Sequence, residues 1–171
     1  VFTKPSPRPY TISAKRFLQY CGYKDADQLF LDRIEEDKRV FGKLDIIPHY
    51  FGFVDSTWRK KKTDNVFNKI VSRIIPELGH IYPIFRYHIA ASESISHHDR
   101  ALMIQIKKKL NRVARSHKDC YIFCPLALKS HLDHVIVRNI CASTIGERVI
   151  FWTDFQYNIQ RKVDVRAIDN M

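Results

Sequence analysis

Two histidines and a carboxylate stand close together in the run His131-Leu132-Asp133-His134. An apolar run from Tyr121 to Cys124, closed by Pro125, comes just before them and predicts a strand. A helix is expected to open at His131 or just after it. In open α/β sheets, ligands bind in the crevice beyond the carboxyl ends of the strands. Imidazoles at a strand-to-helix turn have little packing reason to be there, so this turn is the candidate active site.

Metal-assisted chemistry is one use of such a cluster. Residues three apart on the first helical turn lie on the same side, so His131 and His134 could both face the crevice. A neutral imidazole is a common zinc ligand, and Asp133 could orient one ring by accepting its second N–H. Catalytic zinc takes three protein ligands and leaves one position open, so the remaining ligands must come from elsewhere. The alternative is a surface helix cap with two incidental histidines.

The elements that must position this turn are predicted from hydrophobic periodicity and capping residues. Helices are expected from Thr11 or Ser13 to about Cys21, from about Asp25 to Phe41, over 64–74 and from about Ser96 to Ser116. The third is expected to carry an apolar stripe of Val66, Phe67, Ile70, Val71 and Ile74, and the fourth an inward face of Leu102, Met103, Ile106, Leu110 and Val113. Ser96 and Asp99 have the spacing of a capping box, and His80 is expected to be a core or wall residue. Strands are expected at Phe2-Thr3, within 44–54, at 121–124 and, as a buried strand, at 147–154. Strands that alternate with helices predict an α/β fold with a mostly parallel sheet.

Composition sets the class of protein. A chain of 171 residues with 45% apolar residues is typical of one globular domain, so residues 1–171 are expected to form a single domain. No apolar run approaches the roughly 18 residues that a membrane span needs. The four cysteines form no CxxC pair and lie in apolar segments, which predicts reduced, mostly buried thiols and a cytoplasmic protein.

The charge balance is basic, with 29 Lys and Arg against 18 Asp and Glu and a net charge of +11. Much of the excess lies in Arg59-Lys60-Lys61-Lys62 and in Lys107-Lys108-Lys109. These clusters are either solvated surfaces or a patch that faces phosphate or an acidic glycan. The basic residues lack the interleaved aromatics of nucleic-acid stacking platforms, so nucleic acid is the weaker choice of partner.

A family resemblance follows from the same residues. The runs Pro125-Leu126-Ala127-Leu128, His131 to His134 and Val137-Arg138 resemble the second signature of the PIG-L/LmbE-like zinc-dependent N-deacetylases. Other segments are similar to further elements of that family, more diffusely: Val1 to Phe17, Arg33-x-x-Glu36-Asp37, Phe51-Gly52-Phe53-x-Asp55-x-x-x-Arg59 and Val149 to Tyr157.

The resemblance implies a Rossmann-like three-layer fold and a hydrolase in which zinc-activated water removes the acetyl group of an N-acetylated amino sugar or a similar amide. It implies that His134 is a Zn²⁺ ligand, that His131 acts as general acid or stabilises the oxyanion, and that Asp133 orients His131. Substrate-binding roles are implied for three further residues, Asp55, Arg59 and Asp154. The alternatives are a loop cap for Asp55 and a place in a basic loop for Arg59.

One family element has no counterpart in this sequence. The H-x-D-D motif, which supplies two metal ligands and the general base, is matched nowhere at the right place in residues 1–171. The chain opens on the end of a strand, so we expect the first strand, the first helix and this motif to precede Val1. The 171 residues alone are therefore expected to bind zinc weakly and to turn over little substrate.

Two other function classes compete with the deacetylase. One is a family-like domain without catalysis that binds an anionic glycan or a lipid headgroup. The other is a basic α/β domain that binds nucleic acid, whose affinity would fall steeply with salt.

Overall fold

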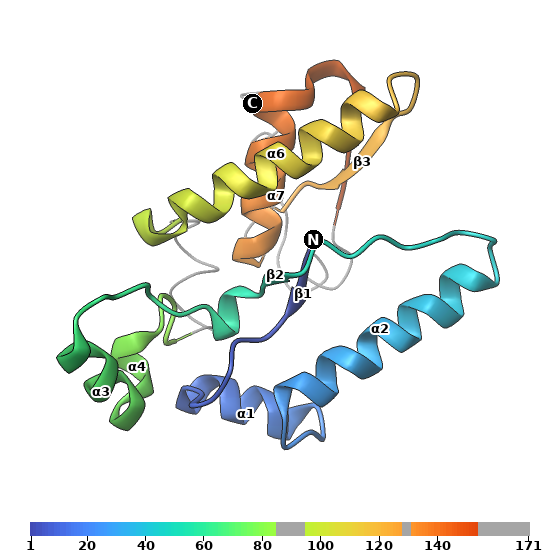
Figure 1. The fold of residues 1–171 in the computed structure, drawn as a ribbon. Helices are drawn as coiled ribbons and strands as arrows, with labels where there is room; N and C mark the ends of the chain where they lie inside the picture. The colour runs from blue at the N-terminus through green and yellow to red at the C-terminus, as the bar shows by residue number, and fades with distance from the viewer. Residues whose placement is uncertain (85–94, 128–130, 154–171) are drawn as a thin grey trace. The chain divides into compact units, whose positions relative to one another are not determined.

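The computed structural model describes residues 1–84, 95–127 and 131–153 (Figure 1). The chain divides into two compact units, Val1–Ile89 (unit 1) and Ala90–Met171 (unit 2). In the described residues these units contain six α-helices and short parallel strands, so the chain is mixed α/β as expected. The assignment of 1–171 to a single domain stays a prediction.

Unit 1 holds a two-stranded parallel sheet formed by β1 (Phe2–Lys4) and β2 (Phe53–Val54). Phe2 pairs with Phe53, and the amide of Asp55 donates to the Lys4 carbonyl at 3.0 Å. The strand end predicted at Phe2-Thr3 is therefore confirmed. This pairing places Asp55 directly beyond the carboxyl end of β2.

Two helices separate these strands in the sequence. Thr11 caps α1 (Ile12–Tyr20) by accepting from the Ala14 amide at 3.1 Å, and Gly22 follows the helix with φ 79°. That left-handed conformation favours glycine after a helix, and the predicted helix end is confirmed. Asp25 caps α2 (Ala26–Gly42) in the same way, accepting from the Asp27 amide at 2.8 Å.

The core of unit 1 gathers around Trp58, which lies in the 3₁₀-helix η1 (Ser56–Trp58) and is 1% exposed. Its ring meets Phe17 and Phe30 edge to face, with centroids 5.9 and 5.2 Å apart. Apolar residues of α1 and α2 complete this cluster. Aromatic burial of this kind supplies much of the stability of a small unit.

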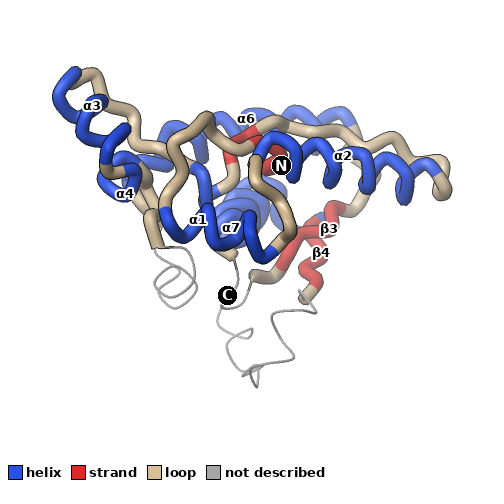
Figure 2. The backbone as a smooth tube through the Cα atoms, turned by 90° about the horizontal axis from the view of Figure 1, so that it is seen from below, coloured by secondary structure: helices blue, strands red, loops and turns tan. Residues whose placement is uncertain are grey.

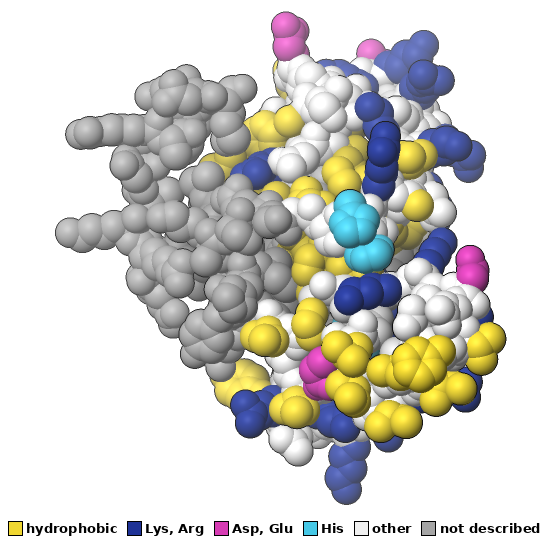
Figure 3. All heavy atoms as spheres, turned by 90° about the vertical axis from the view of Figure 1, so that its left-hand side faces the viewer, with side chains coloured by type: hydrophobic (Ala, Val, Ile, Leu, Met, Phe, Trp, Pro, Cys, Tyr) yellow, Lys and Arg dark blue, Asp and Glu magenta, His cyan; other side chains and the backbone are white. Residues whose placement is uncertain are grey.

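The next two helices, α3 (Val66–Ile74) and α4 (Pro76–Gly79), pack closely against each other. A Cβ added at Gly79 would lie 2.5 Å from the Ser72 Cβ, so only glycine fits this contact. The apolar stripe predicted on α3 exists, but no α3 residue is buried. Its exposed members are Val66, Phe67, Ile70 and Ile74. Figure 3 shows hydrophobic side chains gathered at the surface on the side where α3 and α4 lie in Figure 1.

Unit 2 begins with the 3₁₀-helix η2 (His97–Asp99) and the long helix α6 (Arg100–Ser116). The Ser96 side chain accepts from the His98 amide at 3.3 Å, so the predicted cap is confirmed. The inward face predicted for α6 holds at Ile106, which is fully buried, and is wrong at Val113, which is 43% exposed.

A strand-helix-strand motif follows, made of β3 (Ile122–Pro125), α7 (Leu132–Ile145) and β4 (Val149–Trp152). Figures 1 and 2 show β3 and β4 side by side, and they pair in parallel over four residues. Parallel neighbours need a crossover connection, and α7 provides it. The predicted strand, loop and helix are confirmed here. The predicted burial of the last strand is wrong, because β4 is mostly exposed in the described residues.

No helix in the described part of the chain combines the length and the apolar character that crossing a lipid bilayer requires. All four cysteines are free: Cys124 and Cys141 are buried, Cys21 is half-buried and Cys120 is exposed. The prediction of reduced thiols is confirmed, and that of mostly buried ones holds for two of the four.

The core of unit 1 predicts the cost of removing its central ring. Trp58→Ala should lower the free energy of unfolding by about 3–5 kcal/mol, because it deletes a fully buried aromatic side chain. Urea unfolding followed by circular dichroism measures this loss. Leu31→Ala is the control: Leu31 is 57% exposed on α2, and its truncation should change stability by about 0.5 kcal/mol at most. Equal losses for the two variants would contradict the role given to Trp58.

Candidate metal and catalytic site

The loop from β3 to α7 is tied to both of its neighbours. The Leu126 amide donates to the Trp152 carbonyl at 2.8 Å, which continues the contact with β4 past the strand end. Ala127 has φ 54°, a left-handed conformation that costs a non-glycine residue about 1–2 kcal/mol. The Arg138 guanidinium donates to the Leu126 and Ala127 carbonyls at 3.3 and 3.5 Å. These bonds from α7 help to hold the unusual backbone in place.

His131 caps α7. Its Nδ1 accepts a hydrogen bond of 3.3 Å from the Asp133 amide, and its carbonyl accepts from the His134 and Val135 amides at 2.9 and 3.2 Å. The capping alternative is therefore correct for this residue. The residue is not at the surface, however, since its side chain is 14% exposed.

Asp133 lies in the first turn of α7, and its side chain is 3% exposed. One carboxylate oxygen, Oδ2, is 3.9 Å from His131 Nδ1, which is longer than a hydrogen bond. The positive end of the helix dipole favours a carboxylate in this turn. A half-buried imidazole and a buried carboxylate thus lie together at the start of α7.

The half-buried His134 ring is the third member of the cluster. Its centroid is 5.7 Å from that of His131, and the two planes are inclined by 50°. The expectation that residues three apart would bring both rings to the same side of the turn agrees with this spacing. The HxDH run therefore gathers two imidazoles and a carboxylate within unit 2.

The donor set of this cluster fits a divalent cation. Imidazole nitrogen and carboxylate oxygen each lie about 2.0–2.2 Å from a bound zinc ion, so one ion can reach atoms up to about 4 Å apart. The separation of 3.9 Å between His131 Nδ1 and Asp133 Oδ2 is within that reach. Both side chains offer an atom of the type that holds metal ions. A metal on Nδ1 would replace the capping bond from the Asp133 amide.

The two substrate-binding residues expected in the first half of the chain both belong to unit 1. Asp55 Oδ1 accepts from the Thr57 amide at 2.8 Å, so this half-buried carboxylate begins η1. The loop-cap alternative is therefore correct for Asp55, whose second oxygen this bond does not use.

Arg59 is the other expected residue in unit 1. It is 5% exposed, although the sequence places it in a basic run, and its Nε donates to the Val54 carbonyl at 3.1 Å. Its guanidinium lies over the Phe2 ring, 5.1 Å from the centroid. The buried Arg59 side chain therefore does not belong to the basic surface expected of the lysines that follow it in the sequence. The last expected residue, Asp154, lies outside the described residues.

Two cysteines lie between the strand and the helix that carry the cluster. Cys124 is on β3 and Cys141 is on α7, and both are 1% exposed. A hydrogen bond between the two side chains lowers the pKa of the Cys141 thiol, and burial acts in the opposite direction. Their contact fixes α7 against β3, which in turn fixes the capping turn. The sequence predicted these thiols only as buried residues, because their spacing does not indicate that the two side chains contact each other.

Comparisons with protein-family models, with curated proteins and with solved structures find no match to this chain.

Proposed function

We propose that this chain carries part of the catalytic site of a metal-dependent hydrolase that removes an acetyl group from an N-acetylated amino sugar or a similar amide. The observation that carries the proposal is the His131–Asp133 pair, a half-buried imidazole and a buried carboxylate whose donor atoms lie 3.9 Å apart at a strand-to-helix turn. The resemblance of the surrounding run to the PIG-L/LmbE-like deacetylases supplies the reaction class.

We also propose a Rossmann-like three-layer arrangement for the fold. The β3-α7-β4 motif supports it, because a parallel pair with a helical crossover is the unit from which such sheets are built. The parallel pair of β1 and β2, with α1 and α2 between them in the sequence, is a second such connection.

The roles within the cluster follow from its geometry. His131 and Asp133 would hold the metal, since their donor atoms are the two that one ion can reach together. Zinc, when bound, supplies a Lewis acid and lowers the pKa of water toward about 7. His134, the neighbouring ring, would donate a proton to the leaving nitrogen or a hydrogen bond to the developing oxyanion. This assignment exchanges the roles of the two histidines relative to those that the family resemblance implies.

Further ligands and substrate contacts must come from outside the HxDH run. Asp55 stays a proposed substrate-binding residue, with one carboxylate oxygen outside its capping bond. Arg59 and Asp154 stay proposed substrate-binding residues. A cytoplasmic location is proposed as well, and the four free thiols support a reducing compartment.

Metal affinity tests the ligand assignment. Competition between the chain and a chromophoric chelator for Zn²⁺ should give a dissociation constant that rises at least about tenfold in His131→Ala and in Asp133→Asn. Removing a residue that only hydrogen-bonds to a metal ligand already weakens metal affinity by about tenfold or more, so removing a ligand itself should cost at least as much. His134→Ala should leave the constant nearly unchanged.

His117→Ala is the matched control for this titration, because His117 is an exposed histidine of the same unit. A variant that no longer folds is recognised by its circular dichroism spectrum. The assignment fails if His134→Ala abolishes zinc binding while His131→Ala does not.

Acetate release tests the reaction class. With protein in excess over an amino sugar carrying a radiolabelled acetyl group, even slow turnover gives a measurable signal. Added Zn²⁺ should raise the rate and a chelator should remove it. His134→Asn should lower the rate by about 10² or more, as expected on losing a general acid, without changing zinc affinity. Metal-independent release, or an unchanged rate in His134→Asn, would exclude this mechanism.

A further inference from the structure

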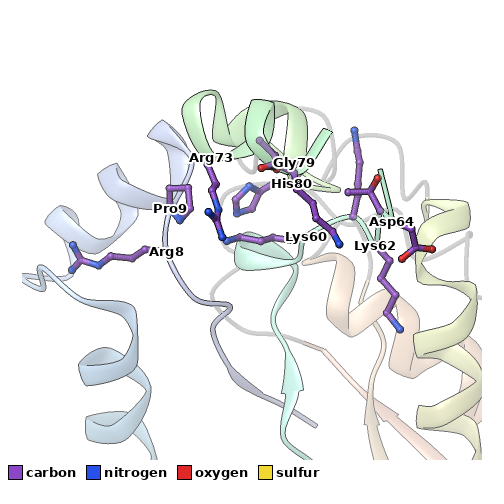
Figure 4. A pocket seen from close by; sticks show the side chains of 12 residues that line it. Arg8, Pro9, Lys60, Lys62, Asp64, Arg73, Gly79 and His80 are labelled. Carbon is purple, nitrogen blue, oxygen red and sulfur yellow. Dashed lines mark hydrogen bonds between the residues drawn. The ribbon is translucent and has the colours of Figure 1, made fainter. Parts of the chain in front are cut away.

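Unit 1 contains a second site that the proposed hydrolase does not use. It is an open pocket of about 510 Å³ beside α3 and α4 (Figure 4). Six basic side chains line it: Arg8, Lys60, Lys61, Lys62, Lys69 and Arg73. The only carboxylate among its lining residues is Asp64. Such a concentration of one charge in a concave surface attracts anions.

Backbone pairing builds this pocket. Lys60 forms an isolated antiparallel bridge with His80, and the Lys61 amide donates to the Gly79 carbonyl at 2.8 Å. The Ile81 amide donates to the Arg59 carbonyl at 2.9 Å on the other side of the bridge. The basic run is therefore not a free loop, and its lysines are held at fixed positions along one wall.

His80 is buried within this wall. It is 1% exposed and lines the pocket, and its Nδ1 lies 2.7 Å from the Pro76 carbonyl oxygen. A carbonyl only accepts, so Nδ1 carries the hydrogen and donates it. Nε2 is buried and has no hydrogen-bond partner in the described part of the chain. A buried polar atom without a partner is costly, and a ligand in the pocket would supply one.

Most of the basic side chains in the lining form no ion pair within the described part of the chain. Arg8 is the exception, because it binds the Asp25 carboxylate at 2.8 Å. Lys60 and Lys61 donate to the carbonyls of Pro7 and Leu78, which leaves their charge in place. In Figure 4 the Arg73 side chain extends from α3 toward Lys60, and the His80 ring lies between Arg73 and Gly79.

We propose that this pocket binds the phosphoryl group of a small phosphomonoester, with Arg73 and Lys60 as its charged contacts and His80 Nε2 as a buried hydrogen-bonding contact. Arginine matches the oxygens of a phosphoryl group with two parallel hydrogen bonds, and lysine adds a point charge. The volume exceeds that of phosphate alone and is within the usual range for small-molecule sites. Among the described lining residues there is no Phe, Tyr or Trp side chain on which a nucleotide base could stack, which disfavours nucleic acid. This site is independent of the proposed metal site.

Titration with phenyl phosphate, followed by isothermal calorimetry on the full chain, tests this proposal. Saturable binding at one site is expected, whereas phenol should not bind. Arg73→Gln and Lys60→Gln should each raise the dissociation constant about tenfold or more, since each removes one charge-assisted contact. Arg73→Lys should recover only part of the loss, because lysine cannot form the paired hydrogen bonds. Lys108→Gln, on the exposed basic run of α6, is the control and should change nothing.

Two further probes separate the sources of the phosphoryl group. Vesicles of phosphatidylcholine with phosphatidic acid present the same group on a lipid, and phenyl phosphate should displace the protein from them if the pocket binds both. The proposal is overturned if the lysine and arginine variants bind phenyl phosphate like the control. It is also overturned if a single-stranded oligonucleotide binds while phenyl phosphate does not compete with it.

His80 predicts a dependence on pH. Burial lowers its pKa; the Pro76 hydrogen bond and Glu77 raise it, and Lys60 lowers it. The other charged side chains that line the pocket are Arg8, Lys61, Lys62, Lys69, Arg73 and Asp64. The free ring is therefore neutral at pH 7, and a bound dianion would favour its protonated form. Proton uptake then accompanies binding, so affinity should rise as pH falls.

Sulfate is the probe for this effect, because phosphate itself titrates near pH 6. The affinity of the wild type for sulfate should increase from about pH 8 to about pH 6, and His80→Gln should remove that increase. Circular dichroism shows whether His80→Gln folds. If it does not, the test is the proton uptake of the wild type on binding sulfate, measured by calorimetry in two buffers of different ionisation enthalpy. Zero uptake on sulfate binding would contradict the role of His80.

Discussion

The parallel pairing of β3 with β4 is the constraint on which the candidate catalytic site depends. Two parallel neighbours cannot be joined by a tight turn, so the chain must leave β3, form α7 and return. That crossover has to begin at the carboxyl end of β3, within a few residues of Pro125. His131 caps the helix at this point, and its position follows from the strand pairing.

The capping role also explains why chemistry and structure meet in the same residues. A helix begins with amides that lack intrahelical partners, and the His131 ring satisfies one of them. Asp133 and His134 follow His131 by two and three positions. Helical geometry fixes where both residues lie relative to the capping ring. A residue needed to start the helix thus brings an imidazole, a carboxylate and a second imidazole together within unit 2.

Sequence patterns predicted the local features well and the tertiary ones less well. The cap at Thr11, one of two candidates, and the starts of α2 and α7 were predicted because a helix start depends on residues within a few positions of it. Burial depends on partners distant in the sequence, and here the patterns were wrong for β4 and for Val113. Arg59 shows the same limit: it was grouped with the lysines beside it, whereas the structure buries it over the ring of Phe2.

His80 was expected only to be a core or wall residue, and its burial fits that expectation while its surroundings add a second meaning. No local sequence pattern predicts the bridge between His80 and Lys60. This bridge places the His80 imidazole among lysines and an arginine. In both units, then, a histidine lies beside groups that could bind a ligand. The buried Nε2 of His80 has no hydrogen-bond partner among the described residues. Burial of such an atom lowers stability, so its position is more readily explained by a ligand than by packing. In unit 2 the ligand would be a cation between an imidazole and a carboxylate, and in unit 1 it would be an anion between an imidazole and basic side chains. The two sites differ in the sign of the charge beside the histidine, and that difference alone decides which kind of ligand each can hold.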